Sequence, residues 1–118
     1  MALTYSKQLL SGSTNGQMIE VDGTSSPGTT IHNVVATTTD AREEVYLYAM
    51  NGATTNSILT IEWGGTGTED QVVFTVPFQD GVYQVIPGGV LTATTSIVRA
   101  FGTATGRLDI LGWVNRAT

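Results

Sequence analysis

Few residues in this chain could carry out chemistry. It has one histidine (His32), one lysine (Lys7) and no cysteine. Nucleophilic, acid–base and transition-metal chemistry draw heavily on these three residue types. His32 alternates with Ile31 and Asn33 in a β-pattern and has no second histidine, cysteine or carboxylate at ligand spacing, so we expect a structural or surface histidine. The sequence therefore predicts that the protein is not an enzyme.

The carboxylates gather in two places, of which the first is Asp40, Glu43 and Glu44 beside Arg42. Paired carboxylates can hydrolyse glycosides when they lie about 5–10 Å apart. Residue spacing does not assemble the groove of aromatic and polar residues that such an enzyme uses. We therefore expect a solvated acidic face, and a glycan-active enzyme is the least favoured reading.

The second group lies in the segment Gly64–Val72, which partly resembles the calcium-binding nonapeptide GGxGxDxUx. Glu69 stands where the motif has Asp, and Gln71 takes the position that should be large and apolar. Calcium sites of this kind need stacked repeats, and the chain has one copy. We expect a flexible hairpin loop too rich in glycine for any regular element, with no metal and no cofactor.

Composition limits the partners. The 118 residues suit one domain, and ten acidic residues against five scattered basic ones give a net charge of −5. A phosphate-binding surface needs clustered Lys and Arg, so we expect no nucleic-acid partner. No apolar run approaches the roughly 18 residues of a membrane-spanning helix, and the N-terminus does not follow the signal-peptide pattern. We expect no membrane association.

The chain is a succession of short runs with period-2 alternation, separated by turn residues such as Asn51-Gly52 and Pro87-Gly88-Gly89. This pattern predicts an all-β single domain over 1–118, an antiparallel β-sandwich or jelly-roll-like barrel of about 8–10 short strands. Leu59–Trp63 and Gln71–Val76 are predicted to form a hairpin. The other predicted strands are Tyr5–Leu10, Gln17–Asp22, Thr30–Thr37, Glu44–Met50, Val82–Ile86, Val90–Thr94, Ser96–Gly102 and Arg107–Arg116.

Residues 1–13 are predicted to be an N-terminal arm, because a short strand pattern precedes the flexible stretch Ser11–Gly16. Such an arm could close the sheet edge of its own domain. It could equally add a strand to a neighbouring molecule.

Two predicted strands are apolar on both faces. Val45, Leu47 and Ala49 suit the core in one strand, and Leu108, Ile110 and Val114 suit it in the other. A strand exposed on one side should not be apolar on both, so either other chain segments or another subunit cover the opposite face. Tyr, Trp and Met are favoured at the centres of interfaces. The candidate residues for an interface with another subunit or a partner on this opposite face are Tyr46, Tyr48, Met50, Leu111 and Trp113.

Three stretches of the chain look familiar: Leu10–Gly16, Leu59–Gly65 and the ending from Val98–Phe101 to Trp113–Arg116. They resemble small all-β proteins of tailed bacteriophages, many of which are capsid decoration (cement) proteins. The resemblance covers most of the chain, and its motifs are structural rather than catalytic. It implies a virion component, made in the host bacterial cytoplasm, that binds the major capsid protein on the outer capsid surface and stabilises the shell, commonly as a homotrimer.

A receptor- or carbohydrate-binding module of a phage fibre or tail is the alternative. That function requires a solvent-exposed aromatic platform on which a ligand can stack. The candidates for such a platform are Trp63 and Trp113.

Overall fold

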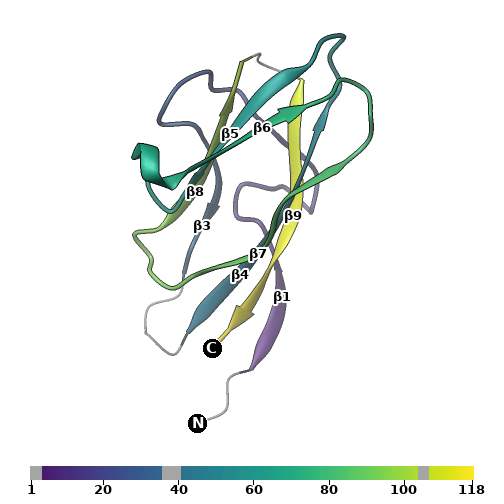
Figure 1. Ribbon diagram of the computed structural model, residues 1–118. Helices are drawn as coiled ribbons and strands as arrows, with labels where there is room; N and C mark the ends of the chain where they lie inside the picture. Colours follow the sequence, from purple (N-terminus) through teal and green to yellow (C-terminus); the bar gives the residue numbers. More distant parts are fainter. Residues whose placement is uncertain (1–3, 36–40, 104–106) are drawn as a thin grey trace.

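The computed structural model describes residues 4–35, 41–103 and 107–118, which form nine β-strands and one short 3-10 helix (Figure 1). The elements are β1 (Tyr5–Leu9), β2 (Ile19–Glu20), β3 (Thr29–Asn33), β4 (Arg42–Asn51), β5 (Ser57–Trp63), η1 (Thr68–Asp70), β6 (Gln71–Val76), β7 (Tyr83–Leu91), β8 (Ile97–Gly102) and β9 (Leu108–Ala117).

Two antiparallel sheets pack face to face (Figure 1). In sheet A the strand order is β1-β9-β4-β7, and β2 also pairs with β9. In sheet B the order is β3-β8-β5-β6. The predicted antiparallel β-sandwich is therefore confirmed. The predicted hairpin is also present, since β5 and β6 pair from Ser57↔Val76 to Glu62↔Gln71.

The centre of sheet A is the pairing of β4 with β9, which runs without interruption from Arg42↔Ala117 to Asn51↔Leu108. Successive side chains of a strand point to opposite faces, so alternate residues of both strands enter the core. The predicted core residues of both strands are confirmed, because all six are almost completely buried: Val45, Leu47, Ala49, Leu108, Ile110 and Val114.

The turn expected at Pro87–Gly89 is wrong, because a single strand, β7, runs through it from Tyr83 to Leu91. β7 is an edge strand of sheet A, where a proline that cannot donate a ladder hydrogen bond is tolerated. The register of β7 on β4 shifts twice, and Gly88 has a φ of +92°, a conformation that favours glycine. The residues that mark a turn here make an irregular strand instead.

Three other boundaries differ from the prediction. Only Ile19–Glu20 of the expected strand Gln17–Asp22 is paired. The strand expected at Thr30–Thr37 is β3, which ends at Asn33, and residues 36–37 lie outside the described residues. The Gly64–Val72 loop contains the 3-10 turn η1, although we expected no regular element there. Glycine content alone did not reveal that Thr68–Asp70 can close one turn.

The first strand closes the sheet of its own domain. β1 pairs with β9 in antiparallel register from Tyr5↔Ala117 to Leu9↔Trp113. The main chains of Thr4 and Thr118 also exchange two hydrogen bonds, of 3.0 and 3.1 Å. Of the two arrangements open to the arm, its described residues adopt the intramolecular one.

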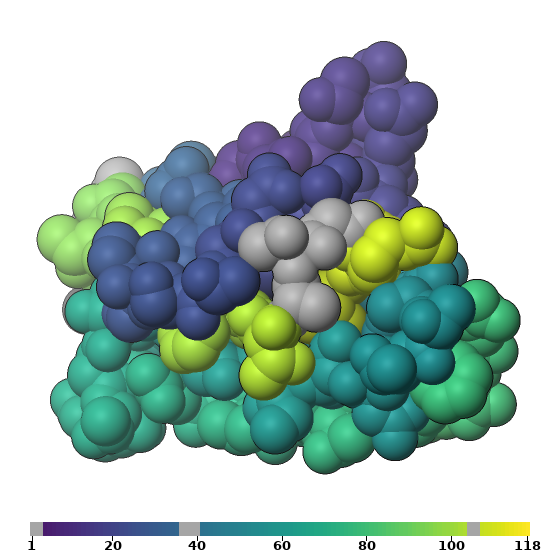
Figure 2. Space-filling model, turned by 90° about the horizontal axis from the view of Figure 1, so that it is seen from above, coloured from purple at the N-terminus to yellow at the C-terminus, as the bar shows by residue number. Residues whose placement is uncertain are grey.

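A buried asparagine organises one end of the sandwich. The Asn51 side-chain amide donates to the carbonyls of Thr55 and Val76, both at 3.0 Å, and its oxygen accepts from the Ala53 N–H. The Asn51 carbonyl accepts from the Gln79 N–H at 2.7 Å. Figure 2, seen from this end, shows the teal β4–β5 connection against the green β6–β7 connection. Asn51 thus joins the β4–β5 connection and the end of β6 through its side chain, and the β6–β7 connection through its backbone carbonyl.

We predict that Asn51→Ala lowers the free energy of unfolding by about 2–3 kcal/mol, because it removes a buried hydrogen bond to the Val76 carbonyl and a part-buried one to the Thr55 carbonyl. Urea unfolding measures this change. Asn56→Ala is the matched control, since the exposed Asn56 side chain accepts one long bond from the Phe78 N–H and its loss should cost under about 1 kcal/mol. Equal losses in the two variants would contradict the role given to Asn51.

Candidate functional site

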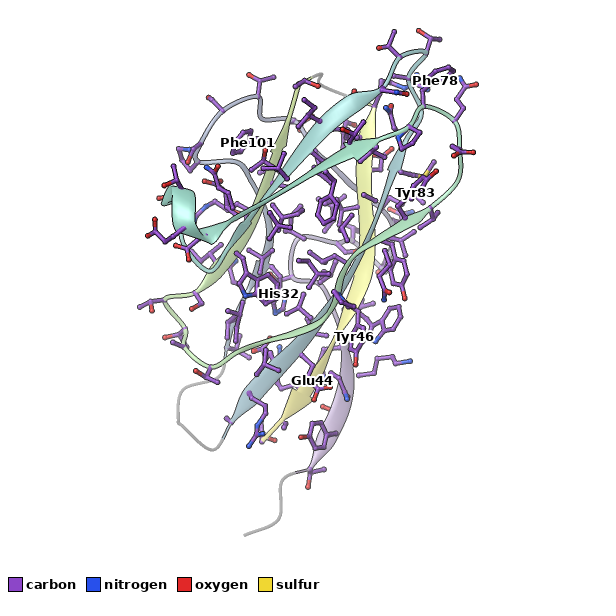
Figure 3. The ribbon with its side chains drawn as sticks, in the orientation of Figure 1. His32, Glu44, Tyr46, Phe78, Tyr83 and Phe101 are labelled. Atoms are coloured by element: carbon purple, nitrogen blue, oxygen red, sulfur yellow. The ribbon has the colours of Figure 1, made fainter. Side chains whose placement is uncertain are left out.

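The histidine lies inside the molecule. Ile31 and His32 are adjacent in β3 and both are almost fully buried, at 0 % and 1 % exposure. Regular alternation would turn one of them outward, but the register of β3 on β8 shifts between Thr30 and His32. This irregularity brings His32 between the sheets (Figure 3). Of the two expected environments, structural or surface, the structural one is observed.

His32 contacts a carboxylate that we expected in solvent. Its Nε2 lies 2.5 Å from Glu43 Oε1, while Glu43 Oε2 accepts from the Val35 N–H at 2.6 Å and lies 3.4 Å from Arg116 Nε. The Ser11 N–H donates to His32 Nδ1 at 3.0 Å. Because Nδ1 accepts this bond, the proton of the neutral ring is on Nε2 and is donated to Glu43. The group joins β3, β4, β9 and the residues after β1.

The predicted solvated face is therefore wrong at Glu43, which has no exposed surface. Burial raises the pKa of the Glu43 carboxyl, but the hydrogen bonds from His32 and Val35 and the positive charge of Arg116 outweigh it and hold the pKa below its ordinary value. Glu44 is half-buried on the opposite face of β4, and Asp40 lies outside the described residues. The error came from treating neighbouring acids as one surface, although alternate strand residues face opposite ways.

The His32–Glu43 pair has the composition of a catalytic dyad but not the access. Both side chains are sealed from solvent, and the Ser11 hydroxyl accepts a 2.7 Å bond from the Asn33 N–H instead of meeting the imidazole. A general base needs a proton donor of the substrate or nucleophile within hydrogen-bond reach. We therefore assign this pair a structural role.

A second carboxylate, Glu62, is buried on the other face of β5 from the core. It accepts hydrogen bonds from the Ser26 hydroxyl at 2.5 Å and from the Gly28 N–H at 2.7 Å. These bonds hold the segment between β2 and β3 against sheet B, so Glu62 is buried although it points away from the core. This carboxylate also acts as a structural anchor.

The candidate interface residues come together on the outer face of sheet A. Across the β4–β9 ladder Tyr46 is opposite Trp113, Tyr48 is opposite Leu111 and Met50 is opposite Asp109. The five predicted residues are each half-buried, and Figure 3 shows Tyr46 pointing away from the sandwich. We call the surface of Tyr46, Tyr48, Met50, Leu111 and Trp113 the aromatic face.

Two exposed apolar residues extend the aromatic face and were missed by sequence reasoning. Leu9, 55 % exposed, is opposite Trp113 in the register of β1. Met18, 44 % exposed, precedes Ile19, which is opposite Ile110, so the same register places Met18 beside Leu111. The alternation of β1 could have indicated that Leu9 faces outward, because the next residue, Leu10, belongs to the core.

The aromatic rings cover one another. The ring centroid of Trp113 lies 5.1 Å from that of Tyr46 and 5.7 Å from that of Tyr48, with nearly parallel planes. Lys7 Nζ lies 5.2 Å from the centroid of the same indole. Since β9 lies between β1 and β4, the lysine reaches Trp113 from one flank and the tyrosines from the other. A planar ligand would have to displace one of these groups to stack on Trp113.

The second candidate stacking residue, Trp63, is partly buried and packs against the hydrophobic core. It lies close to β7, where a side chain at Gly89 would come within 2.6 Å of the indole. Its place in the structure is that of a core residue at one end of the sandwich.

Charge is unequal at the two ends of the aromatic face. Lys7 and Glu44 lie at one end, while Glu20 is opposite Asp109 at the other, with Asp22 close by. A hydrogen bond with Asp22 and its negative charge, together with burial and the charge of Asp109, raise the pKa of Glu20. Burial also raises the pKa of Asp109, against the effect of the positive Arg107. The carboxylates at this end repel one another.

Comparisons of the chain with protein-family models, curated proteins and solved structures find no match. Within residues 4–35, 41–103 and 107–118, no group of three or more His, Asp or Glu side chains is placed to hold a metal ion. The same residues contain no helix with the length and apolar character to cross a bilayer. Function must therefore be argued from the surface of the sandwich.

We predict that Glu43→Gln lowers the free energy of unfolding at pH 7 by about 3 kcal/mol, since it removes the charge that Arg116 and His32 face in a buried site. A carboxyl whose pKa is lower in the folded state stabilises the fold above its unfolded value, here 4.5, and this contribution is lost as the pH falls through the folded value. The difference between the two proteins should therefore shrink below about pH 4.5.

Glu44→Gln is the control, because Glu44 is on the outward side of β4 with a 3.4 Å contact from Asn115. We expect a change within about 0.5 kcal/mol at pH 7. Denaturant unfolding at a series of pH values measures both variants. A stability difference for Glu43→Gln that does not vary with pH would contradict the assigned charge state.

Proposed function

We propose that this protein is a structural virion component that attaches to the outer surface of an assembled phage capsid and stabilises the shell as a decoration (cement) protein. The observation that carries the proposal is the aromatic face. Its residues are half-exposed, apolar and extended by Leu9 and Met18, and apolar patches of this kind mark interaction sites. The resemblance of three chain stretches to phage decoration proteins supports the choice of a capsid as the partner.

The strand order supports the jelly-roll form of the predicted fold. With β2 set aside, eight strands divide into the orders 1-9-4-7 and 3-8-5-6, and the connections from β3 to β4, β4 to β5, β6 to β7, β7 to β8 and β8 to β9 each cross between sheets. Double-sheet jelly rolls occur in viral capsid proteins and in lectins. This support is an analogy at the level of the fold, and the function has to be argued from the aromatic face.

On the shell the protein would lie in groups of three at threefold positions, with the major capsid protein as its partner. Many symmetric contacts would together hold it by avidity without one large interface. The net charge of −5 disfavours recruitment by DNA phosphates. The proposed role involves no catalysis and no cofactor.

The alternative, a carbohydrate- or receptor-binding module of a fibre or tail, is less well supported. A sugar stacks on an open ring face. Trp113 has Tyr46 on one flank and Lys7 on the other, and Trp63 packs against the core. The aromatic face is therefore better suited to a protein surface that fits over its ring edges and side chains.

We predict that Tyr48→Asp remains folded and loses binding to expanded empty shells, because it places a charge in the middle of the aromatic face. Co-sedimentation with shells of the encoding phage measures binding, and circular dichroism confirms folding. Val73→Asp is the matched control, since Val73 is 59 % exposed and lies in β6 of the other sheet. This control should bind as the wild type does.

Unassembled capsid protein provides the second comparison. Decoration sites arise where several subunits meet, so the wild type should bind shells and not free subunits. Equal binding to both, or to neither, would refute the proposal and favour the fibre alternative. Unfolding of Tyr48→Asp would instead show that Tyr48 is part of the core, and Leu9→Asp, at the exposed margin of the aromatic face, would then repeat the test.

A further inference from the structure

The aromatic face carries four rows of side chains that run across the strands of sheet A. In order along β9 they are Lys7, Asn115 and Glu44; Leu9, Trp113 and Tyr46; Met18, Leu111 and Tyr48; and Glu20, Asp109 and Met50. The two inner rows are apolar or aromatic. The two outer rows carry charge, and they lie six residues apart along β9, or about 20 Å.

The charges on the flank formed by β1 and β2 have opposite signs at the two ends. Lys7 is exposed in the first row and Glu20 is exposed in the last. Glu20 lies beside Asp109 and Asp22, and this crowding of carboxylates would be relieved by a cation. The Glu44 carboxylate in the first row lies two strands from Lys7 and contacts the Asn115 amide at 3.4 Å.

The β1–β2 flank of the face is positive at one end and negative at the other, so this flank is complementary to itself when one copy is reversed. We propose that in solution the aromatic face pairs with the same face of a second copy, about a two-fold axis that lies between the two faces and runs across the strands. This rotation places the first row of each copy over the last row of the other. Lys7 of each copy then meets Glu20 of the other, which gives two symmetric contacts. The inner rows then place Leu9 over Met18 and Trp113 over Leu111.

The proposal accounts for the most exposed apolar residues of the face. Leu9 and Met18 lie between Lys7 and Glu20 on the same flank. The two-fold axis therefore passes beside Leu9 and Met18. The face measures about 20 Å by 15 Å from strand rise and spacing, so two copies bury about 600 Å² in total, which is below the size of stable specific interfaces and suits a transient contact. The dimer is therefore weak, with a dissociation constant in the micromolar to millimolar range. Because shell binding would use the same face, pairing and shell binding exclude each other.

Charge reversal tests the arrangement through its symmetry. Lys7→Glu alone creates two contacts between like charges in the dimer, and Glu20→Lys alone does the same. In a mixture of the two variants, each mixed pair has one Glu–Lys contact made by the substituted residues and one made by the native residues. Both substitutions are at exposed side chains, so the variants should fold.

Sedimentation equilibrium from about 10 µM to about 1 mM measures the association. We expect a monomer–dimer equilibrium for the wild type, dissociation constants at least about tenfold higher for each single variant, and recovery in the equimolar mixture and in the double variant. A wild type that is monomeric throughout, or that forms trimers, would overturn the proposal. So would single variants that associate like the wild type, or a mixture no better than its components.

The shell assay separates this proposal from the proposed function. A monomeric wild type that binds shells would remove the dimer and leave the decoration role intact. If the variants dimerise again when mixed, but neither the monomer nor the dimer binds shells, the dimer would stand and the decoration role would be removed.

Discussion

The pairing of β4 with β9 is the interaction on which the rest of the molecule depends. These two strands form the longest continuous ladder among the described residues, from Arg42↔Ala117 to Asn51↔Leu108, and they lie at the centre of sheet A. The side-chain period of two gives this ladder two different faces. One face provides core residues such as Val45 and Val114, and the other provides Tyr46 and Trp113. A slip of one residue would exchange these faces, so both the core and the candidate interface require this register.

Buried carboxylates hold the irregular segments to this regular centre. Glu43 of β4 binds His32, the Val35 N–H and Arg116, and thereby joins β3 to sheet A. Glu62 of β5 holds the segment that contains Ser26. Each carboxylate accepts at least two hydrogen bonds, which compensates part of the cost of removing a charge from water. Such groups specify one arrangement of loops, because any other arrangement would leave a buried charge without donors.

Regular features of this fold could be predicted from the sequence, and irregular ones could not. Period-2 alternation identified the core and outward faces of β4 and β9 because both strands are uninterrupted. It failed where a register shift breaks the period. The shift in β3 turns His32 inward to Glu43, and the shifts in β7 carry the chain straight through Pro87 and Gly88. The partner of a buried histidine depends on which strands become neighbours, and a single sequence does not give strand order.

The aromatic face is ordered before it meets any partner. Tyr46 packs on Trp113 and against Gly88, where an added Cβ would lie 3.0 Å from the tyrosine ring. Trp113 also contacts Tyr48 and Lys7. Side chains already held by their neighbours lose little conformational freedom on association, so more of the burial free energy remains as affinity. The glycine at position 88, which looks like a turn signal in the sequence, therefore supports the aromatic face by giving the Tyr46 ring a place on the backbone of β7.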